Sequence, residues 1–407
     1  MSTQRVPPVW ILSIPWLTYG MLGGFVIVTL PQMLAAQEVP GGRIAMAVGV
    51  IISPLFWNVV LAPLLDVRFR RRTYALVFAV LAVTATALTV THHASLIAVE
   101  AVMVFGFLCL CMFQSAIGGW IGSLIQKEQD SRLGAWSTVY SSGGNGAGIL
   151  ISGYAVEHFS QAPAAAFIFV VFLAPLLVCP AIPAPPPSEL LASENFSRFI
   201  REAASLLKGR EVLLALPLLA LPSASFALTN ALGGWSGKFH ALPSSVSIIS
   251  GVGIILGSIA GCSLVPPVAR KLPLRPLYLC IGLAGAAFTL SLLLLPRVPT
   301  TFGLAFIGEN FFQAAALATG VSIIFEVVGP GNPLAATTFA LLIAAMAFPI
   351  DYMQMVDARA YDWHGITGAF LVDALVSGAA CILLAIVLRR QLFPTPPAAG
   401  PARDAIS

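Results

Sequence analysis

Twelve long apolar stretches separated by short polar segments dominate this chain of 407 residues. An α-helix needs about 20 apolar residues to cross a bilayer, and each stretch is close to that length or longer. The stretches lie near residues 10–35, 44–66, 73–91, 95–124, 134–156, 163–183, 211–233, 245–267, 276–296, 300–327, 333–356 and 366–388. Since 58% of the residues are hydrophobic and 9% are charged, the composition excludes a water-soluble globule. The pattern predicts an all-α, polytopic membrane protein with 12 transmembrane helices.

The basic residues are shared unequally between the two sides of the membrane. If the stretches alternate in direction and the N-terminus lies inside, only four of the 21 Lys and Arg residues fall outside: Arg43, Lys238, Arg297 and Arg359. Basic residues favour the cytoplasmic side, so both termini are predicted to be cytoplasmic. The net charge of +4 comes from these inner loops and indicates contact with membrane lipid rather than with a nucleic acid.

A change of composition after the sixth stretch predicts two domains. The segment is rich in proline, then polar, and from Leu190 to Leu207 its apolar positions recur at helical spacing, which is typical of a helix on the membrane surface. The predicted division is an N-terminal six-helix bundle over 1–183, a cytoplasmic linker with an amphipathic helix over 184–210, a C-terminal six-helix bundle over 211–390 and a disordered tail over 391–407.

The layout of two six-helix bundles resembles the major facilitator superfamily, whose halves rock about a central site. The turn after the second stretch, APLLDVRFRRR, is similar to that superfamily's signature G-x3-D-R-x-G-R-R, with Ala62 in place of the glycine and Val67 in place of the first arginine. The resemblance implies that Asp66, Arg70 and Arg71 form a conformational latch. A carboxylate facing guanidinium groups where water is scarce makes a strong pair that must break when the halves separate.

The first two stretches look like one branch of the superfamily, the peptide/acetyl-coenzyme A/drug transporters, which includes muropeptide permeases and siderophore importers. The similarity is carried by Tyr19-Gly20-x2-Gly23-Gly24-x6-Pro31 and by Phe56-Trp57-x4-Ala62-Pro63-Leu64-x-Asp66. Muropeptide permeases have Gln-Asp-x3-Asp in the fourth stretch, whereas this chain has Gln114-Ser115-x3-Gly119. The block from Glu309 to Gln354 is closer to the siderophore importers.

The resemblance implies a secondary active transporter that works by alternating access in a bacterial inner membrane. The expected activity is proton-coupled uptake of a polar organic solute, such as a siderophore complex, by a monomer without cofactor or metal. A muropeptide or acyl-CoA-like permease, an efflux carrier of the same fold and a membrane enzyme acting on a lipid-linked substrate are the alternatives. The glycine-rich run from Ser141 to Gly148 lacks the lysine of a phosphate-binding loop, so energy is expected from an ion gradient or from the solute's own gradient.

Polar and ionisable side chains inside the stretches are the candidate site residues, because they are costly in hydrocarbon. Glu309 and Asp351 are the candidates for proton coupling, and Asp373 is expected to be a structural partner. Amides and aromatic rings suit a polar solute that bears rings or acyl portions, although they also suit ordinary packing between helices. The candidates for substrate binding are Tyr19, Gln32, Gln114, Trp120, Trp136, Tyr140, Asn145, Asn230, Asn310, Gln313, Tyr352 and Gln354.

Overall fold

The computed structural model describes residues 6–39, 41–66, 69–92, 95–184, 209–224, 226–240, 243–330, 332 and 334–389. The part of the chain so described is helical and contains no strand, which confirms the predicted all-α class. Seven of its helices are long and apolar enough to cross a membrane. The predicted linker helix and tail lie outside these residues.

The first six predicted stretches correspond to helices α1 to α9, several of which are interrupted. The first contains a π-helical turn, η1, and the second is broken near Pro54 and Pro63, since proline cannot donate a hydrogen bond inside a helix. The elements are α1 (Val9–Ser13), α2 (Trp16–Gly24), η1 (Phe25–Thr29), α3 (Leu30–Ala35), α4 (Gly41–Ile52), α5 (Pro54–Trp57), η2 (Asn58–Val60), η3 (Ala62–Asp66), α6 (Arg71–Thr91), α7 (Leu96–Gly122), η4 (Lys127–Gln129), α8 (Asp130–His158), α9 (Gln161–Leu173) and η5 (Ala174–Ala181).

The last six stretches correspond to helices α11 to α16. The seventh is discontinuous between α11 and α12, and α16 is two helices that meet at His364 and Gly365, where φ of Gly365 is 61° and the backbone leaves the helical region. The elements are α11 (Arg210–Ala220), α12 (Leu228–Trp235), η6 (Ser236–Phe239), α13 (Pro243–Ala269), α14 (Leu274–Leu292), α15 (Pro299–Val328) and α16 (Ala335–Val387).

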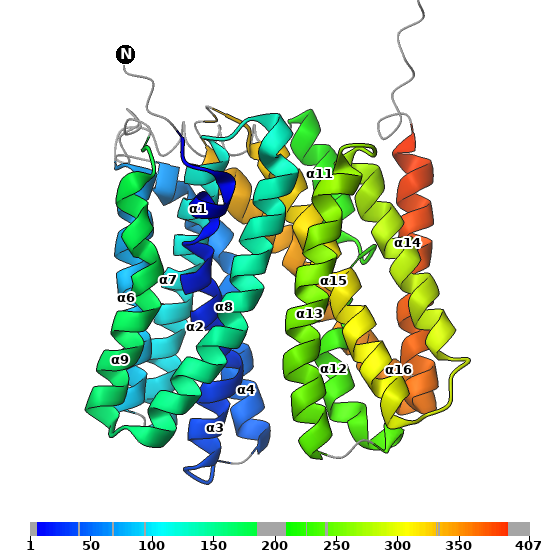
Figure 1. Ribbon diagram of the computed structural model, residues 1–407, viewed down its shortest axis with the longest axis horizontal. Helices are drawn as coiled ribbons and strands as arrows, with labels where there is room; N and C mark the ends of the chain where they lie inside the picture. The colour runs from blue at the N-terminus through cyan, green and yellow to red at the C-terminus, as the bar shows by residue number, and fades with distance from the viewer. Residues whose placement is uncertain are drawn as a thin grey trace, which may run out of the picture.

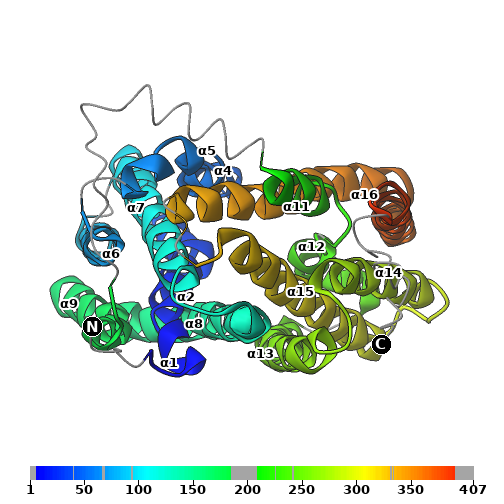
Figure 2. The same cartoon turned by 90° about the horizontal axis from the view of Figure 1, so that it is seen from above.

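The helices form two groups that lie side by side (Figures 1 and 2). Helices α1 to α9, the first half, lie on one side of the molecule, and α11 to α16, the second half, lie on the other. We call the end where α1 begins and α16 ends the terminal face, which is at the top of Figure 1. The opposite end, where α3 and α8 end and α15 begins, is the distal face.

The two halves pack tightly against each other near the terminal face. Gly119 of α7 approaches α16 so closely that an added Cβ would lie 2.5 Å from the backbone nitrogen of Ala336. Gly134 of α8 similarly meets the side chain of Ser322 on α15. Small residues let helix backbones approach in a membrane, where van der Waals packing replaces the hydrophobic effect. These contacts therefore close the space between the halves at the terminal face.

A neighbouring flank of α8 is open toward the distal face. Gly146 and Gly153 continue, at helical spacing, the stripe that passes through Ser142. An added Cβ at either glycine would meet nothing within 4 Å. This flank of α8 is therefore open at Gly146 and Gly153, and the helices of the two halves lie farther apart at the distal face than at the terminal face (Figure 1).

Packing within the first half depends on the glycines of α2. Replacing Gly20 by alanine is expected to lower the free energy of unfolding by about 1–3 kcal/mol, a typical cost of overpacking. The reason is that an added Cβ would lie 2.8 Å from the backbone nitrogen of Asn145 and 2.9 Å from Cα of Gly144. Thermal unfolding in detergent measures the effect. The matched control is Gly143→Ala, where the Cβ has open space; equal melting temperatures for the two variants would contradict the assignment.

Candidate functional site

A cavity of about 180 Å³ lies between the two halves. The first half contributes Trp16, Tyr19, Leu55, Gln114, Ser137, Thr138, Ser141 and Ser142 to its lining. The second half contributes Leu317, Val321, Phe339, Ile343, Met346, Ala347 and Ile350. Contributions from both halves are what a solute site needs if the halves move relative to each other during transport.

The first-half wall of this cavity is rich in neutral hydrogen-bonding groups. The hydroxyls of Ser137 and Thr138 donate to the backbone carbonyl of Gly134, at 3.0 and 2.8 Å, which leaves their oxygen lone pairs free to accept. Gln114 interacts with the hydroxyl of Tyr19 by a side-chain hydrogen bond and offers both an amide donor and an amide acceptor. This wall can therefore hold the polar part of a solute without providing a charge.

The second-half wall is apolar. Its α16 residues recur every three or four positions, so Phe339, Ile343, Ala347 and Ile350 lie on one stripe of the helix. Gln354 continues this stripe one turn closer to the distal face and is half-buried. Apolar groups of a solute are removed from water when they contact such side chains, which is favourable, so the wall suits rings or acyl groups.

Of the predicted substrate-binding residues, Tyr19 and Gln114 line the cavity and Gln354 lies on its stripe. Four others are instead hydrogen-bonded to backbone or to neighbouring helices. The bonds are Trp120 Nε1 to Pro183 O at 2.7 Å, Asn310 Nδ2 to Phe306 O at 2.8 Å, Gln313 Nε2 to Thr229 Oγ1 at 2.8 Å and Tyr352 OH to Ala220 O at 3.1 Å. Trp120, Gln313 and Tyr352 thus join separate segments of the chain, the alternative that the sequence left open, whereas Asn310 bonds within its own helix.

The remaining candidates lie apart from the cavity lining. Gln32 is exposed on α3, and the rings of Trp136 and Tyr140 contact each other at 5.8 Å on α8. Asn145 lies beside α2, where its Nδ2 would be 3.8 Å from an added Cβ at Gly23. The side chain of Asn230 lies outside the described part of the chain.

The cavity also contains residues that the sequence reasoning missed, namely Ser137, Thr138, Ser141 and Ser142. They occupy positions i, i+1, i+4 and i+5 of α8, which places them on one face of the helix. In the sequence, this spacing of hydroxyl side chains within an apolar stretch could have indicated that these residues line a cavity.

The two predicted coupling carboxyls have different surroundings. Glu309 is fully buried within the second half, where its Oε1 lies 2.5 Å from Oγ1 of Thr289. Asp351 is half-buried and directly follows Ile350, a residue of the cavity wall. The Oδ2 atom of Asp351 has no hydrogen-bond partner among the described residues. Neither carboxyl lines the cavity, but Asp351 follows a lining residue in the sequence of α16.

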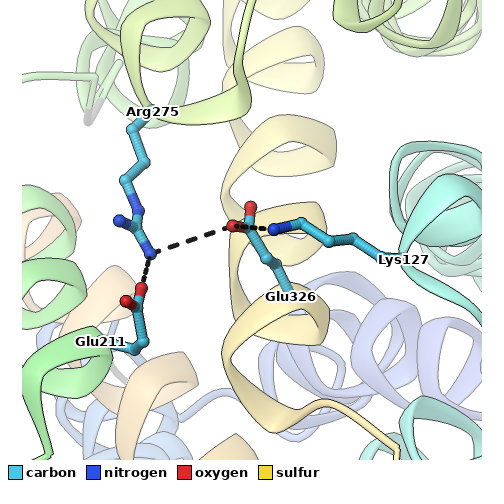
Figure 3. A network of polar contacts seen from close by, with 4 residues as sticks. All are labelled: Lys127, Glu211, Arg275 and Glu326. Carbon is cyan, nitrogen blue, oxygen red and sulfur yellow. Dashed lines mark hydrogen bonds and ion pairs between the residues drawn. The ribbon is translucent and has the colours of Figure 1, made fainter. Parts of the chain in front are cut away.

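An ion-pair network joins the halves at the terminal face (Figure 3). Lys127 Nζ, from the first half, lies 3.4 Å from Oε1 of Glu326 in the second half. Arg275 Nη2 lies 4.0 Å from the same oxygen and also pairs with Glu211, at the start of α11. Since Glu326 is the acceptor for cations from both halves, the network holds the halves together at this face.

The predicted latch is also at the terminal face. Arg71 Nη2 donates to the backbone carbonyl of Asn332, across the two halves, at 3.0 Å. Arg70 is exposed and directly precedes α6. The side chain of Asp66 lies outside the described part of the structure. Arg71 thus reaches the turn between α15 and α16.

Asp130, which lies next to this network, makes the stability of the protein depend on pH. It lies at the first position of α8, four residues before the predicted membrane stretch, and the charges that face it are those of Glu326, Lys127, Glu128 and Arg270. Burial, helped by the negative charge of Glu326, raises the pKa of Asp130 from 3.8 to about 7, while Lys127 acts in the opposite direction.

The expected pH dependence of stability follows from the difference in proton binding between the folded and the unfolded protein. Because the folded protein binds the Asp130 proton more tightly than the unfolded chain, stability from this group is full below pH 3.8 and is lost as the pH rises to about 7. Asp130→Asn should therefore flatten the pH dependence of the melting temperature in that window. The difference between wild type and variant is the readout; a difference that stays constant from pH 4 to 7 would contradict the assignment.

Comparison with known proteins gives a consistent picture of the fold. The family model described as Major Facilitator Superfamily matches residues 16–349. The chain is similar to the crystal structure of the human organic anion transporter MFSD10 (TETRAN), with a TM-score of 0.70, 18% identity and coverage of 93% of this chain and 100% of that chain. It is also similar to the proton:xylose symporter XylE bound to 6-bromo-6-deoxy-D-glucose, with a TM-score of 0.65, 13% identity and coverage of 95% and 94%. No curated protein sequence matches the chain significantly.

Proposed function

The chain belongs to the Major Facilitator Superfamily, so it is a multi-pass membrane transporter and not an enzyme, and we propose that it takes up a polar organic solute together with protons. The favoured class of solute is an amphipathic one such as a metal–siderophore complex. The proposed location is a bacterial inner membrane, with the terminal face in the cytoplasm and the distal face outside. The peptide/acetyl-coenzyme A/drug branch remains the proposed subgroup.

The single observation that carries this proposal is the two-sided cavity. One wall offers hydroxyl and amide groups, the other offers aliphatic, thioether and aromatic groups, and none of the lining side chains is formally charged. A solute with a polar face and an apolar face satisfies both walls, because each buried polar group needs a hydrogen bond and each apolar surface favours removal from water. A muropeptide or an acyl-CoA, which carries carboxylates or phosphates, would meet no cation in this cavity.

The proposed orientation rests on charge. Arg71, Lys127, Arg270 and Arg275 all lie at the terminal face, and basic residues favour the cytoplasmic side of a membrane. In this orientation the contacts at Gly119 and Gly134 close the cytoplasmic side, and the open flank of α8 leads outside. The arrangement is that of a carrier open to the outside, a state through which both uptake and efflux pass. The proposed direction, uptake, therefore comes from the resemblance to siderophore importers.

Glu309 and Asp351 remain the proposed coupling residues. A buried carboxyl favours its neutral form because an unpaired charge is costly in a medium of low dielectric constant, so it can hold a proton in one state and release it when water enters. Asp351 follows a cavity residue and Glu309 lies deeper in the second half. The Arg71 contact with Asn332 supports the proposed latch of Asp66, Arg70 and Arg71.

Uptake into proteoliposomes tests the function. Purified protein is expected to accumulate a radiolabelled metal–siderophore complex when the outside is made acidic, and a proton uncoupler should abolish accumulation. Gln114→Leu should weaken binding of the solute, because it removes a buried donor and acceptor; the matched control is Gln32→Leu on exposed α3. Accumulation that follows a sodium gradient would overturn the proposed proton coupling. Transport only from inside to outside would overturn the proposed direction of uptake.

A further inference from the structure

Three buried carboxyl groups meet within the second half, apart from the residues that line the cavity. Glu309 of α15, Asp357 before the break in α16 and Asp373 after that break are 0%, 1% and 3% exposed. Each of the three interacts electrostatically with the other two. The helix break at His364 and Gly365 turns the chain back on itself, which explains how two distant positions of one long helix reach the same place.

The carboxyl oxygens in this cluster are mostly without partners. Among the described residues, no hydrogen bond reaches Oε2 of Glu309, either carboxyl oxygen of Asp357, or Oδ1 of Asp373. Buried polar atoms are hydrogen-bonded in the great majority of cases, so four orphaned oxygens at one place indicate a missing ligand. These side chains are nine-tenths buried or more and belong to different helical segments that converge on one site.

The charged groups nearby on the described chain do not neutralise the cluster. Arg297 donates to the hydroxyl of Thr367 at 2.6 Å in an exposed position. Arg359, Asp362 and His364 are exposed near the distal end of α16. Three adjacent carboxylates cannot all be ionised in a buried place, since like charges repel strongly where the dielectric constant is low.

The hydroxyl of Thr289 is placed to accept a proton held by the carboxyl of Glu309. Its single hydrogen has two acceptors within reach, the carbonyl of Gly285 at 3.1 Å and Oε1 of Glu309 at 2.5 Å. Other buried threonines of this chain, Thr86 and Thr319, donate to the carbonyl four residues earlier. If Thr289 does the same, the hydrogen between Thr289 and Glu309 must belong to the carboxyl group.

A metal ion fits the cluster less well than a proton. Metal ions need several ligands around one point, and the described residues contain no group of three His, Cys, Asp or Glu side chains arranged to hold one. A proton needs only one carboxyl oxygen and can be shared between neighbouring carboxyls.

The cluster lies toward the distal face, and a pair of stacked aromatic rings lies one helical turn from Asp357. Tyr361 is one turn beyond Asp357 toward the distal end of its helix, and its ring stacks on that of Trp235 with centroids 4.6 Å apart. Both aromatic residues are half-buried, and their stacked rings join α12 to the segment of α16 that carries Asp357. Movement of α12 relative to α16 would separate these rings.

We propose that Glu309, Asp357 and Asp373 form one proton-binding site that exchanges protons with the distal side and is separate from the solute cavity. Protons from water on that side neutralise the carboxylates and are held in common, so that removing one carboxyl changes the protonation of the other two. This inference rests on the proposed proton coupling and deepens it by assigning Asp357 and Asp373 to the coupling site.

Infrared titration of the purified, full-length protein tests the site directly. The C=O band of protonated carboxyls should decrease as the pH is raised, because the carboxyls then release their protons. Asp357→Asn and Asp373→Asn should each remove part of this band and shift the titration of the remainder. Asp362→Asn, an exposed change on the same helix, is the matched control and should leave the titration unchanged.

The outcomes separate this site from the transport proposal. A band that is unchanged in both variants, or a titration that responds to sodium instead of to protons, would overturn the proton site. If the band behaves as expected but uptake does not follow the pH gradient, the site stands and the proposed coupling fails. A variant that does not fold is replaced by Thr289→Val, which keeps all three carboxyls, removes the hydroxyl beside Glu309 and should shift the titration of the band.

Discussion

Replacing Gly119 by leucine is expected to reduce transport to the level of protein-free liposomes. Even a single added carbon at this position would lie 2.5 Å from the backbone nitrogen of Ala336, where α7 meets α16 at the terminal face. A leucine would force the halves apart there, and backbone atoms cannot move aside as a flexible side chain can. The carrier would then be unable to reach the state that is closed at the terminal face.

Alternating access requires both states, so uptake and exchange should fail together in this variant. Gly143→Leu is the matched control, because a Cβ at that position of α8 meets nothing within 4 Å. Labelling of single cysteines at the terminal face should increase in Gly119→Leu and stay unchanged in the control. Normal exchange by a correctly folded Gly119→Leu protein would show that this contact is not needed for the cycle.

Glu309→Gln is expected to abolish accumulation against a gradient while leaving exchange of solute across the membrane intact. Glutamine keeps the size and the hydrogen bond to Thr289 but cannot release or take up a proton. The variant would be fixed in the equivalent of the protonated state, in which solute can bind and cross but the proton step is missing.

The measurement compares two assays on the same proteoliposomes, uptake driven by a pH gradient and counterflow driven by solute alone. Glu157→Gln, an exposed change at the distal end of α8, is the control and should affect neither assay. Undiminished gradient-driven uptake by Glu309→Gln would remove Glu309 from the coupling role. Loss of both assays would instead point to a structural role for this carboxyl.

The fold class was predictable because the bilayer imposes a simple rule on sequence. Every segment that crosses the bilayer must be long, apolar and helical, because a helix satisfies its own backbone hydrogen bonds. The charges of the loops indicate which side of the membrane each loop faces. The interruptions within single helices were harder to predict from the sequence. The break in α16 at His364 and Gly365 lies in the gap predicted between 333–356 and 366–388, whereas the interruption between α11 and α12 falls inside the predicted stretch 211–233.

The candidate site was predictable only in part, because polarity alone does not tell which way a side chain faces. Tyr19 and Gln114 line the cavity, whereas Trp120, an equally polar choice, is fully buried and bonds to Pro183. The meeting of Asp373 with Glu309 depends on contacts between distant helices, which spacing along one helix cannot express.

The unequal walls of the cavity have a consequence for how selectivity can change over evolutionary time. Helices α2, α7 and α8 carry the side chains that bind the hydrogen-bonding part of the solute. Helices α15 and α16 carry the side chains that contact its apolar part. Mutations that tune one property would leave the other nearly untouched. A chimera that joins the first half of this chain to the second half of a related carrier should therefore keep the preferred head group and adopt a new tail.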